Sequence, residues 1–375
     1  MHFRRTGAPG IIFVVDREEI GLLFLSVSEV SLMSNDLLRM FKPEWATDLE
    51  VFSEMEPAVE RIEQIYDHEV DNLRKAFQAF VAGDRDSHEN AAYYPFLGVY
   101  VQPQELNLDG RLAFGALHEP NVYGTTLTRP ALFKDYFRDQ IGRLMANHGV
   151  PVVVGRSRRP LPLPFVVDEV SGDLPPDRAR EVQYRFSLPD LRTTDDSIAN
   201  GTWSYNGEEP YPLALFTAER VDYSLHRLHH YTGTTAEHFQ PYILLTNYQR
   251  YVDHFVKLAK DEVASGRPGV SFVEPGDIVT SADEDGDTPS LAHLPQMPAY
   301  HFKRPDGAGV TMVNIGIGPS NAKTITDHLA VLRPHCWLML GHCAGLRRSQ
   351  RLGDYVLAHG YVREDHVLDK EVPNF

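Results

Sequence analysis

Two stretches decide the fold of this chain: VNIGIGPSNAK at residues 313–323 and WLMLGHCAGL at residues 337–346. Each begins with an apolar run typical of a buried strand and ends in a turn of small residues. Ser320 is placed to cap a helix that Pro334 would end. The order strand, helix, strand predicts a parallel βαβ unit. Because glycine turns let a ligand approach the backbone closely, we expect a binding site at these turns.

The same alternation continues upstream of these stretches. An apolar run at 242–245 predicts a strand, 247–264 predicts a helix, and 270–273 predicts the next strand. Residues 274–298 are acidic and rich in Pro and Gly, so we expect a surface excursion there. This half of the chain is therefore predicted to be an α/β domain with a mixed, mostly parallel sheet.

The N-terminal half has a different pattern, in which helices and short strands are not in regular alternation. Residues 189–212 are polar and turn-rich, and the basic, Pro-rich segment 156–164 is predicted to be an extended, exposed connector. These features favour an α+β domain. The predicted elements are a helix at 54–83, strands at 94–101, 111–117 and 122–127, a helix at 131–148 ending at Gly149, a strand at 151–155 and a helix at 216–231.

Three segments follow from these patterns. Residues 1–40 look like a loose tail or a misassigned start, residues 41–235 form the α+β domain, and residues 236–375 form the α/β domain. The length of 375 residues fits two domains.

Composition limits the possible partners. The formal net charge of −16 argues against a nucleic-acid partner, because that affinity depends on neutralising phosphates with Lys and Arg. Charged residues interrupt the most apolar N-terminal region, so we expect neither a membrane span nor a signal peptide. The two cysteines, Cys336 and Cys343, predict buried free thiols and a cytoplasmic location.

Two motifs suggest other chemistries. Gly316 and Gly318 invite a dinucleotide-binding interpretation, but Asn321 occupies the third glycine position and no acidic residue stands about 20 positions on. His226, His229 and His230 share helical spacing, yet no carboxylate completes a familiar metal pattern. We therefore expect no metal and no redox cofactor.

The motifs together closely resemble bacterial AMP nucleosidase over residues 55–369. The resemblance includes the N-terminal domain and the domain junction as well as the glycine turns. The matching segments are TTLTRP at 125–130, VDYSL at 221–225, HYTGT at 230–234, EHFQP at 237–241, NIGIGPSNAKT at 314–324, DHLAVLRP at 327–334, GHCAGLR at 341–347 and GDYVLA at 353–358.

This resemblance implies an N-glycosyl hydrolase that converts AMP to adenine and ribose 5-phosphate, without a cofactor for the chemistry. It also implies Mg-ATP as an allosteric activator, inorganic phosphate as an inhibitor, and a homohexamer. The α/β domain is expected to resemble purine nucleoside phosphorylases and to contain only the N-terminal half of that fold.

The resemblance also suggests site residues. In the phosphorylase superfamily the loop after the first strand carries a phosphate-binding arginine, and TNYQR at 246–250 stands at that place, so Arg250 is the expected anion ligand. The second superfamily arginine and a serine fall on Met339 and His342, and we hypothesise that losing this arginine favours water over phosphate as nucleophile. The turn that follows is expected to border the base and ribose, and the N-terminal domain is expected to help at the 5′-phosphate. The full set of substrate-binding candidates is Arg250, His342, Cys343, Ala344, Gly345, Thr128 and Arg129.

The catalytic residue itself is not identified. The superfamily places the acid at N7 and the ribose glutamate further along the fold, so we expect the acid beyond Phe375. A chain without it would be inactive. Besides AMP hydrolysis, two alternatives therefore stay open: a non-catalytic nucleotide-binding fragment or regulatory partner, and a purine nucleoside phosphorylase.

Overall fold

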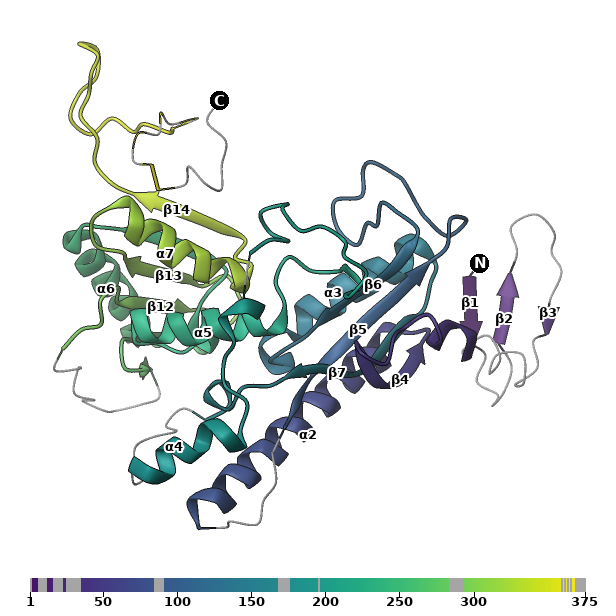
Figure 1. Cartoon of the computed structure of the whole chain (residues 1–375). Coiled ribbons are helices and arrows are strands. Elements are labelled where there is room, and N and C mark those ends of the chain that lie inside the picture. Colours follow the sequence, from purple (N-terminus) through teal and green to yellow (C-terminus); the bar gives the residue numbers. More distant parts are fainter. Residues whose placement is uncertain are drawn as a thin grey trace. The chain divides into compact units, whose positions relative to one another are not determined.

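The computed structural model of the chain forms two compact units, Met1–Tyr223 and Ser224–Phe375 (Figure 1). The division falls inside one helix, α5 (Ala218–Thr232), whereas the sequence places the domain boundary after it, at 235/236. The structure describes 35–83, 91–167, 176–194, 196–282, 293–358, 360, 362, 364, 366 and 367, plus the backbone of three N-terminal strands.

The first unit is built on a five-stranded sheet. Its strand order is β4-β7-β5-β6-β8, and every pairing is antiparallel except that of β6 with β8. With the helices that follow, this is the α+β arrangement that the sequence predicts. The strands are β4 (Ala46–Phe52), β5 (Tyr93–Val101), β6 (Asn121–Thr126), β7 (Val152–Pro160) and β8 (Tyr211–Pro212).

Two long helices of this unit are confirmed. α2 (Met55–Val81) has apolar residues every three or four positions, and this stripe is buried, with Phe80 stacked on Phe77. α3 (Pro130–His148) starts with its proline in the first turn and ends at Gly149, whose φ of 66° lies in the left-handed region.

Two predictions in this unit are wrong. Residues 111–117 are irregular and form no strand. The chain turns just before them, where the side chains of Asn107 and Asp109 accept backbone N–H groups two residues on. The segment 156–164 is not an exposed connector: β7 continues through it to Pro160, and the following Leu161 and Leu163 are buried. Proline is tolerated here because it ends the strand.

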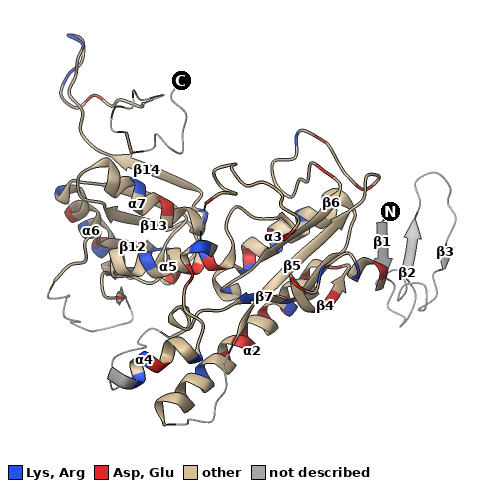
Figure 2. Cartoon of the chain, in the orientation of Figure 1, with Lys and Arg blue, Asp and Glu red and all other residues tan. Residues whose placement is uncertain are grey.

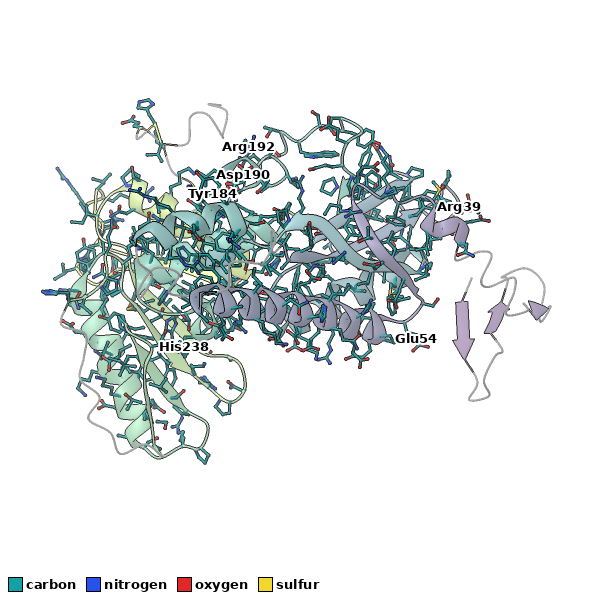
Figure 3. The ribbon with its side chains drawn as sticks, turned by 60° about the horizontal axis from the view of Figure 1, so that its bottom comes forward. Arg39, Glu54, Tyr184, Asp190, Arg192 and His238 are labelled. Carbon is teal, nitrogen blue, oxygen red and sulfur yellow. The ribbon has the colours of Figure 1, made fainter. Side chains whose placement is uncertain are left out.

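Residues 189–212 are turn-rich, as predicted, around a short 3-10 helix, η2 (Leu191–Thr193). Asp190 caps it by accepting the backbone N–H of Arg192, whose guanidinium also binds the carboxylate (Figure 3). This hydrogen bonding lowers the pKa of Asp190 to about 2. Two further short elements of the unit are η1 (Leu163–Phe165) and α4 (Pro176–Arg185).

The N-terminal segment contains a three-stranded antiparallel sheet of β1 (His2–Arg5), β2 (Ile12–Val15) and β3 (Leu23–Phe24). The rest of 1–34 lies outside the described residues, so the tail prediction stays a prediction there. Within 35–40, Leu37 and Leu38 pack against a buried cluster that contains Phe41.

The second unit is built on a six-stranded sheet of order β11-β10-β12-β13-β9-β14. β9 pairs in parallel with β13 and β14, and the other three pairings are antiparallel. The sheet is therefore mixed, as predicted, but not mostly parallel. The strands are β9 (Tyr242–Thr246), β10 (Ser271–Glu274), β11 (Ile278–Ser281), β12 (Ala299–Lys303), β13 (Val310–Asn314) and β14 (Cys336–Leu340).

The extra antiparallel strands explain this difference. The predicted surface excursion 274–298 contains β11, which forms a hairpin with β10, and it also contains Met297, which is buried. Residues 283–292 of this segment lie outside the described residues. β12 was not predicted because its five residues mix apolar side chains with a histidine and a lysine and follow a polar segment.

Helices cover both faces of this sheet. α6 (Gln249–Ala264) packs on the face that carries Met312 and Tyr300. α7 (Pro319–Leu329) packs with α5 on the other face, where the Ser224 hydroxyl lies 3.1 Å from Nδ1 of His328. Figure 1 shows α5 and α7 together in front of the sheet.

The start of α7 differs from the prediction. The N-cap is Gly318, not Ser320, which lies within the helix, and the cap makes no side-chain hydrogen bond. A proline in the first turn and a glycine with φ of 114° provide the helix start instead. α7 is followed by the 3-10 helix η4 (Ala330–Leu332).

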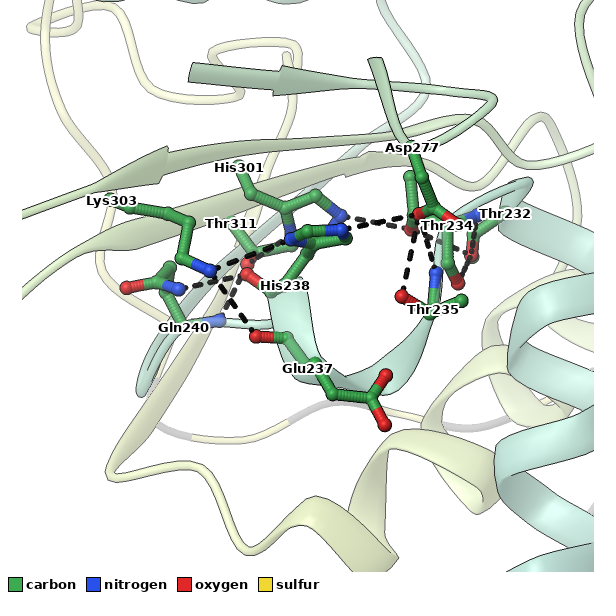
Figure 4. Close-up of polar contacts among 10 residues, drawn as sticks. All are labelled: Thr232, Thr234, Thr235, Glu237, His238, Gln240, Asp277, His301, Lys303 and Thr311. Carbon is green, nitrogen blue, oxygen red and sulfur yellow. Dashed lines mark hydrogen bonds and ion pairs between the residues drawn. The ribbon is translucent and has the colours of Figure 1, made fainter. Parts of the chain in front are cut away.

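A buried polar network fixes the strand β12 to the segment after α5 (Figure 4). Both ring nitrogens of His301 lie 2.9 Å from a threonine hydroxyl: Nδ1 from Thr311 and Nε2 from Thr234. The network continues into the 3-10 helix η3 (Ala236–His238), where His238 lies near Lys303. Burial, together with the neighbouring His238 and Lys303, holds the pKa of His301 well below its ordinary value.

The burial of His301 predicts that the protein loses stability at acidic pH. Because its pKa is lowered on folding, the unfolded chain binds the proton first, and stability falls as the pH drops below the unfolded value of about 6.5. His301→Gln should remove up to about 2 kcal/mol of the stability difference between pH 7 and pH 5, measured by urea unfolding. His229→Gln, at an exposed position of α5, is the control. An unchanged pH dependence in His301→Gln would contradict this account.

Candidate functional site

Three turns meet at one edge of the second unit. β9 is flanked by β13 and β14, and all three strands run in the same direction, so their carboxyl ends lie side by side. The chain crosses from β13 over β9 to β14 through α7. Ligands of α/β sheets typically bind outside the carboxyl ends of parallel strands, where connections leave in different directions. The turns after Thr246, Asn314 and Leu340 therefore form the candidate site.

Hydrogen bonds tie these turns together. The Thr246 hydroxyl is 3.2 Å from the Leu340 carbonyl oxygen and also accepts the backbone N–H of Tyr248. On the other side of β9, the Asn314 side chain donates to the Gln249 side chain at 3.0 Å and accepts the backbone N–H of Gly316. The first turn of α6 is thus held between the ends of β13 and β14.

The two main predicted residues of this site lie in contact. Nη2 of Arg250, in the first turn of α6, is 3.1 Å from Nε2 of His342, which follows β14. The Tyr251 hydroxyl is 2.7 Å from the same nitrogen, and the Tyr248 ring lies 4.4 Å from the His342 ring, centre to centre. Arg250 and His342 are both exposed, so the guanidinium and imidazole are open to a ligand.

The rest of the predicted turn lies beside this cluster in sequence. Cys343, Ala344 and Gly345 are exposed in an irregular segment after β14, and their contact with base or ribose stays a prediction. Cys336 and Cys343 are free, as expected, but both are exposed, so the prediction of buried thiols is wrong.

β14 itself is less buried than predicted. Trp337, Leu338 and Met339 are each about half exposed, because β14 is the edge strand and pairs only with β9 among the described strands. The prediction of two buried strands holds for β13 and fails for β14. Its apolar sequence therefore indicated a strand correctly but not its position in the sheet.

Thr128 and Arg129 lie in the first unit, where a buried carboxylate binds them both. Asp222 of α5 accepts the Thr128 hydroxyl at 2.9 Å, the Tyr94 hydroxyl at 2.8 Å and Nε of Arg129 at 3.1 Å. A second guanidinium nitrogen of Arg129 donates to the Phe165 carbonyl oxygen. A role of Thr128 and Arg129 at the 5′-phosphate stays a prediction, but their structural role is clear.

The electrostatics of this group follow from its burial. Desolvation raises the pKa of the Asp222 carboxyl, while Arg129 and the two hydroxyls oppose that rise. Burial and the nearby carboxyl also raise the pKa of Tyr66 to about 12 and that of Tyr94 well above its ordinary value. Arg129 has φ of 43°, a left-handed conformation that costs a non-glycine residue about 1 kcal/mol or more. Its bonds to Asp222 and Phe165 stabilise this helix start.

Removing the cation should therefore destabilise the protein. Arg129→Ala leaves Asp222 buried without its charged partner, and we expect a loss of about 3 kcal/mol in the free energy of unfolding. Arg143→Ala is the matched control, because Arg143 pairs with Asp139 on the exposed side of the same helix, where ion pairs contribute less than about 1 kcal/mol. Equal losses of unfolding free energy in Arg129→Ala and Arg143→Ala, measured by urea unfolding, would show that Arg129 is not a structural residue.

Four residues of the strand-end site were not predicted from the sequence. Tyr248, Gln249, Tyr251 and Asn314 join the turns together or contact the imidazole. The motif TNYQR indicated Arg250 alone. Tyr248 and Tyr251 contact His342 because both lie at the start of α6. The signal that could have found them is two tyrosines spaced three apart at a helix N-terminus.

Charge is spread over both units. Figure 2 shows acidic and basic residues interspersed along helices such as α2 and α5. Within the described part of the chain, no group of three potential metal-ligating His, Cys, Asp or Glu side chains gathers at one point. The described helices include none that combines the length and apolar character needed to cross a membrane.

Comparison with known proteins gives strong sequence matches. A family profile described as the N-terminus of bacterial AMP nucleoside phosphorylase matches residues 57–210. The AMP nucleosidases of Escherichia coli K12 and O157:H7 are each 41% identical over 326 residues, covering 84% of this chain and 67% of theirs. The crystal structure of AMP nucleosidase from Bacteroides thetaiotaomicron VPI-5482 is 28% identical over 36% of this chain and 45% of that chain, with a TM-score of 0.25. The sequence matches agree with the resemblance drawn from the motifs.

Proposed function

Because the chain belongs to the AMP nucleosidase family, we propose that it hydrolyses the N-glycosidic bond of AMP to adenine and ribose 5-phosphate. The observation that carries this proposal within the structure is the contact of Arg250 with His342 at the ends of three parallel strands. A guanidinium beside an open turn is suited to a phosphate, because it presents several N–H donors in a fixed plane.

Cleavage of the N-glycosidic bond determines which charges the site must stabilise. Breaking the bond between ribose and N9 builds positive charge on the sugar and negative charge on the purine. Binding the 5′-phosphate at Arg250 would fix the ribose, so that the turn after His342 borders the reacting part of the nucleotide. Met339, where related phosphorylases carry a second arginine, adds no cation for a free phosphate, which favours water as the nucleophile.

Adenine release tests the reaction. AMP incubated with the protein in phosphate-free buffer should yield adenine and ribose 5-phosphate in equal amounts by chromatography. Such release would contradict the expectation that the catalytic acid lies beyond Phe375. Release that requires phosphate and gives a sugar 1-phosphate would contradict hydrolysis and support a phosphorylase. AMP binding without adenine release would support the non-catalytic nucleotide-binding alternative.

Arg250→Ala tests the binding site separately. Losing a charge-assisted hydrogen bond should weaken AMP binding by about 1.5–3 kcal/mol in calorimetry. Adenosine lacks the 5′-phosphate, so its affinity should be the same for the variant and the unmodified protein.

Arg267→Ala is the matched control for this measurement. Arg267 follows the opposite end of α6, where it pairs with Glu262, and its loss should leave AMP binding unchanged. Unchanged AMP affinity in Arg250→Ala would remove Arg250 from the site. An equal loss for AMP and adenosine would show that it does not act on the phosphate.

The family resemblance supports further proposals about regulation. We propose that Mg-ATP activates the enzyme allosterically, that inorganic phosphate inhibits it, and that it acts as a homohexamer in the cytoplasm. Inhibition by phosphate is in keeping with an Arg250 site, because a free phosphate and the 5′-phosphate of AMP would compete for the same guanidinium.

A further inference from the structure

The start of α6 fixes the orientation of the His342 imidazole. Arg250 and Tyr251 both contact its Nε2, at 3.1 Å and 2.7 Å. Two tyrosine rings flank the imidazole: the ring centres of Tyr248 and Tyr251 lie 4.4 Å and 5.4 Å from it. The loop after β14 therefore presents this side chain in an orientation determined by a helix of the same unit.

These contacts also determine which nitrogen carries the proton. A guanidinium can only donate hydrogen bonds, so its contact with Nε2 requires a lone pair there. A neutral imidazole with a lone pair on Nε2 has its proton on Nδ1. Nδ1 has no hydrogen-bond partner among the described residues and is left to donate to a ligand.

Arg250 and Tyr251 compete for one lone pair. A guanidinium that turns toward a phosphate gives up its hydrogen bond to Nε2. The Tyr251 hydroxyl can donate to that lone pair alone, so the imidazole keeps both its orientation and its tautomer.

We propose that Tyr251 is a positioning residue for nucleoside monophosphate binding. Its hydroxyl holds His342 in the Nδ1–H form when Arg250 engages the anion, and His342 then donates from Nδ1 to an oxygen of the nucleotide. The identity of the anion rests on the proposed function, whereas the tautomer is a property of the ligand-free protein.

Nitrogen NMR of histidine-labelled protein reads the tautomer directly, with the His342 signal assigned by its loss in His342→Asn. We expect an unprotonated Nε2 in the unmodified protein and in the single variants Arg250→Ala and Tyr251→Phe. In the double variant no donor holds the lone pair, and the proton should move to Nε2, the form that free histidine favours. A protonated Nε2 in the unmodified protein, or an unchanged tautomer in the double variant, would overturn the proposal.

AMP binding supplies the second readout. With AMP bound, the His342 signal of Tyr251→Phe should resemble that of the double variant. The affinity of Tyr251→Phe for AMP should be ~10-fold lower than that of the unmodified protein. Tyr242→Phe, at the opposite end of β9, is the control and should keep full affinity. Equal affinities of Tyr251→Phe and the control would contradict the positioning role. If the unmodified protein binds no AMP, the proposed function fails, but the tautomer of the ligand-free protein still decides the role of Tyr251.

Discussion

The parallel pairing of β9 with β13 on one side and β14 on the other is the constraint on which the candidate site depends. Residues 246–250, 314–318 and 341–345 are far apart in the sequence, and this pairing alone brings their turns to one edge. The Thr246 hydroxyl and the Asn314 amide then fix the start of α6 between the two neighbouring turns. Arg250 and His342 meet because each stands a few residues beyond the end of a paired strand.

The two units use buried polar groups in a similar way. In the first unit Asp222 binds two hydroxyls and a guanidinium, and in the second unit His301 binds two threonine hydroxyls. Burying either group costs folding free energy unless all its hydrogen bonds are made. Each group therefore specifies one arrangement of the elements around it. The candidate site differs, because Arg250 and His342 are exposed and can exchange the hydrogen bond between them for bonds to a ligand.

Much of the fold was predictable, and the failures have physical causes. Apolar periodicity identified α2, Pro130 and Gly149 marked the ends of α3, and a short apolar run identified β13. The apolar pattern missed β12, whose five residues carry a histidine and a lysine, and it overrated the burial of β14, since an apolar run does not reveal an edge position. Ser320 failed as a cap because Gly318 and Pro319 already start the helix.

The residues of the candidate site were predictable only in part. Arg250 and His342 came from family motifs, and the strand register explains their meeting. Tyr251 could not be found that way, because its contact depends on the direction in which the first turn of α6 points its side chains.

The central claim is that the nucleotide binds where these three strands end. A crystal structure of the protein with AMP tests it most directly. The account predicts the 5′-phosphate within hydrogen-bonding distance of the Arg250 guanidinium, with the ribose beside His342. AMP bound at another place, with Arg250 still on His342, would contradict it.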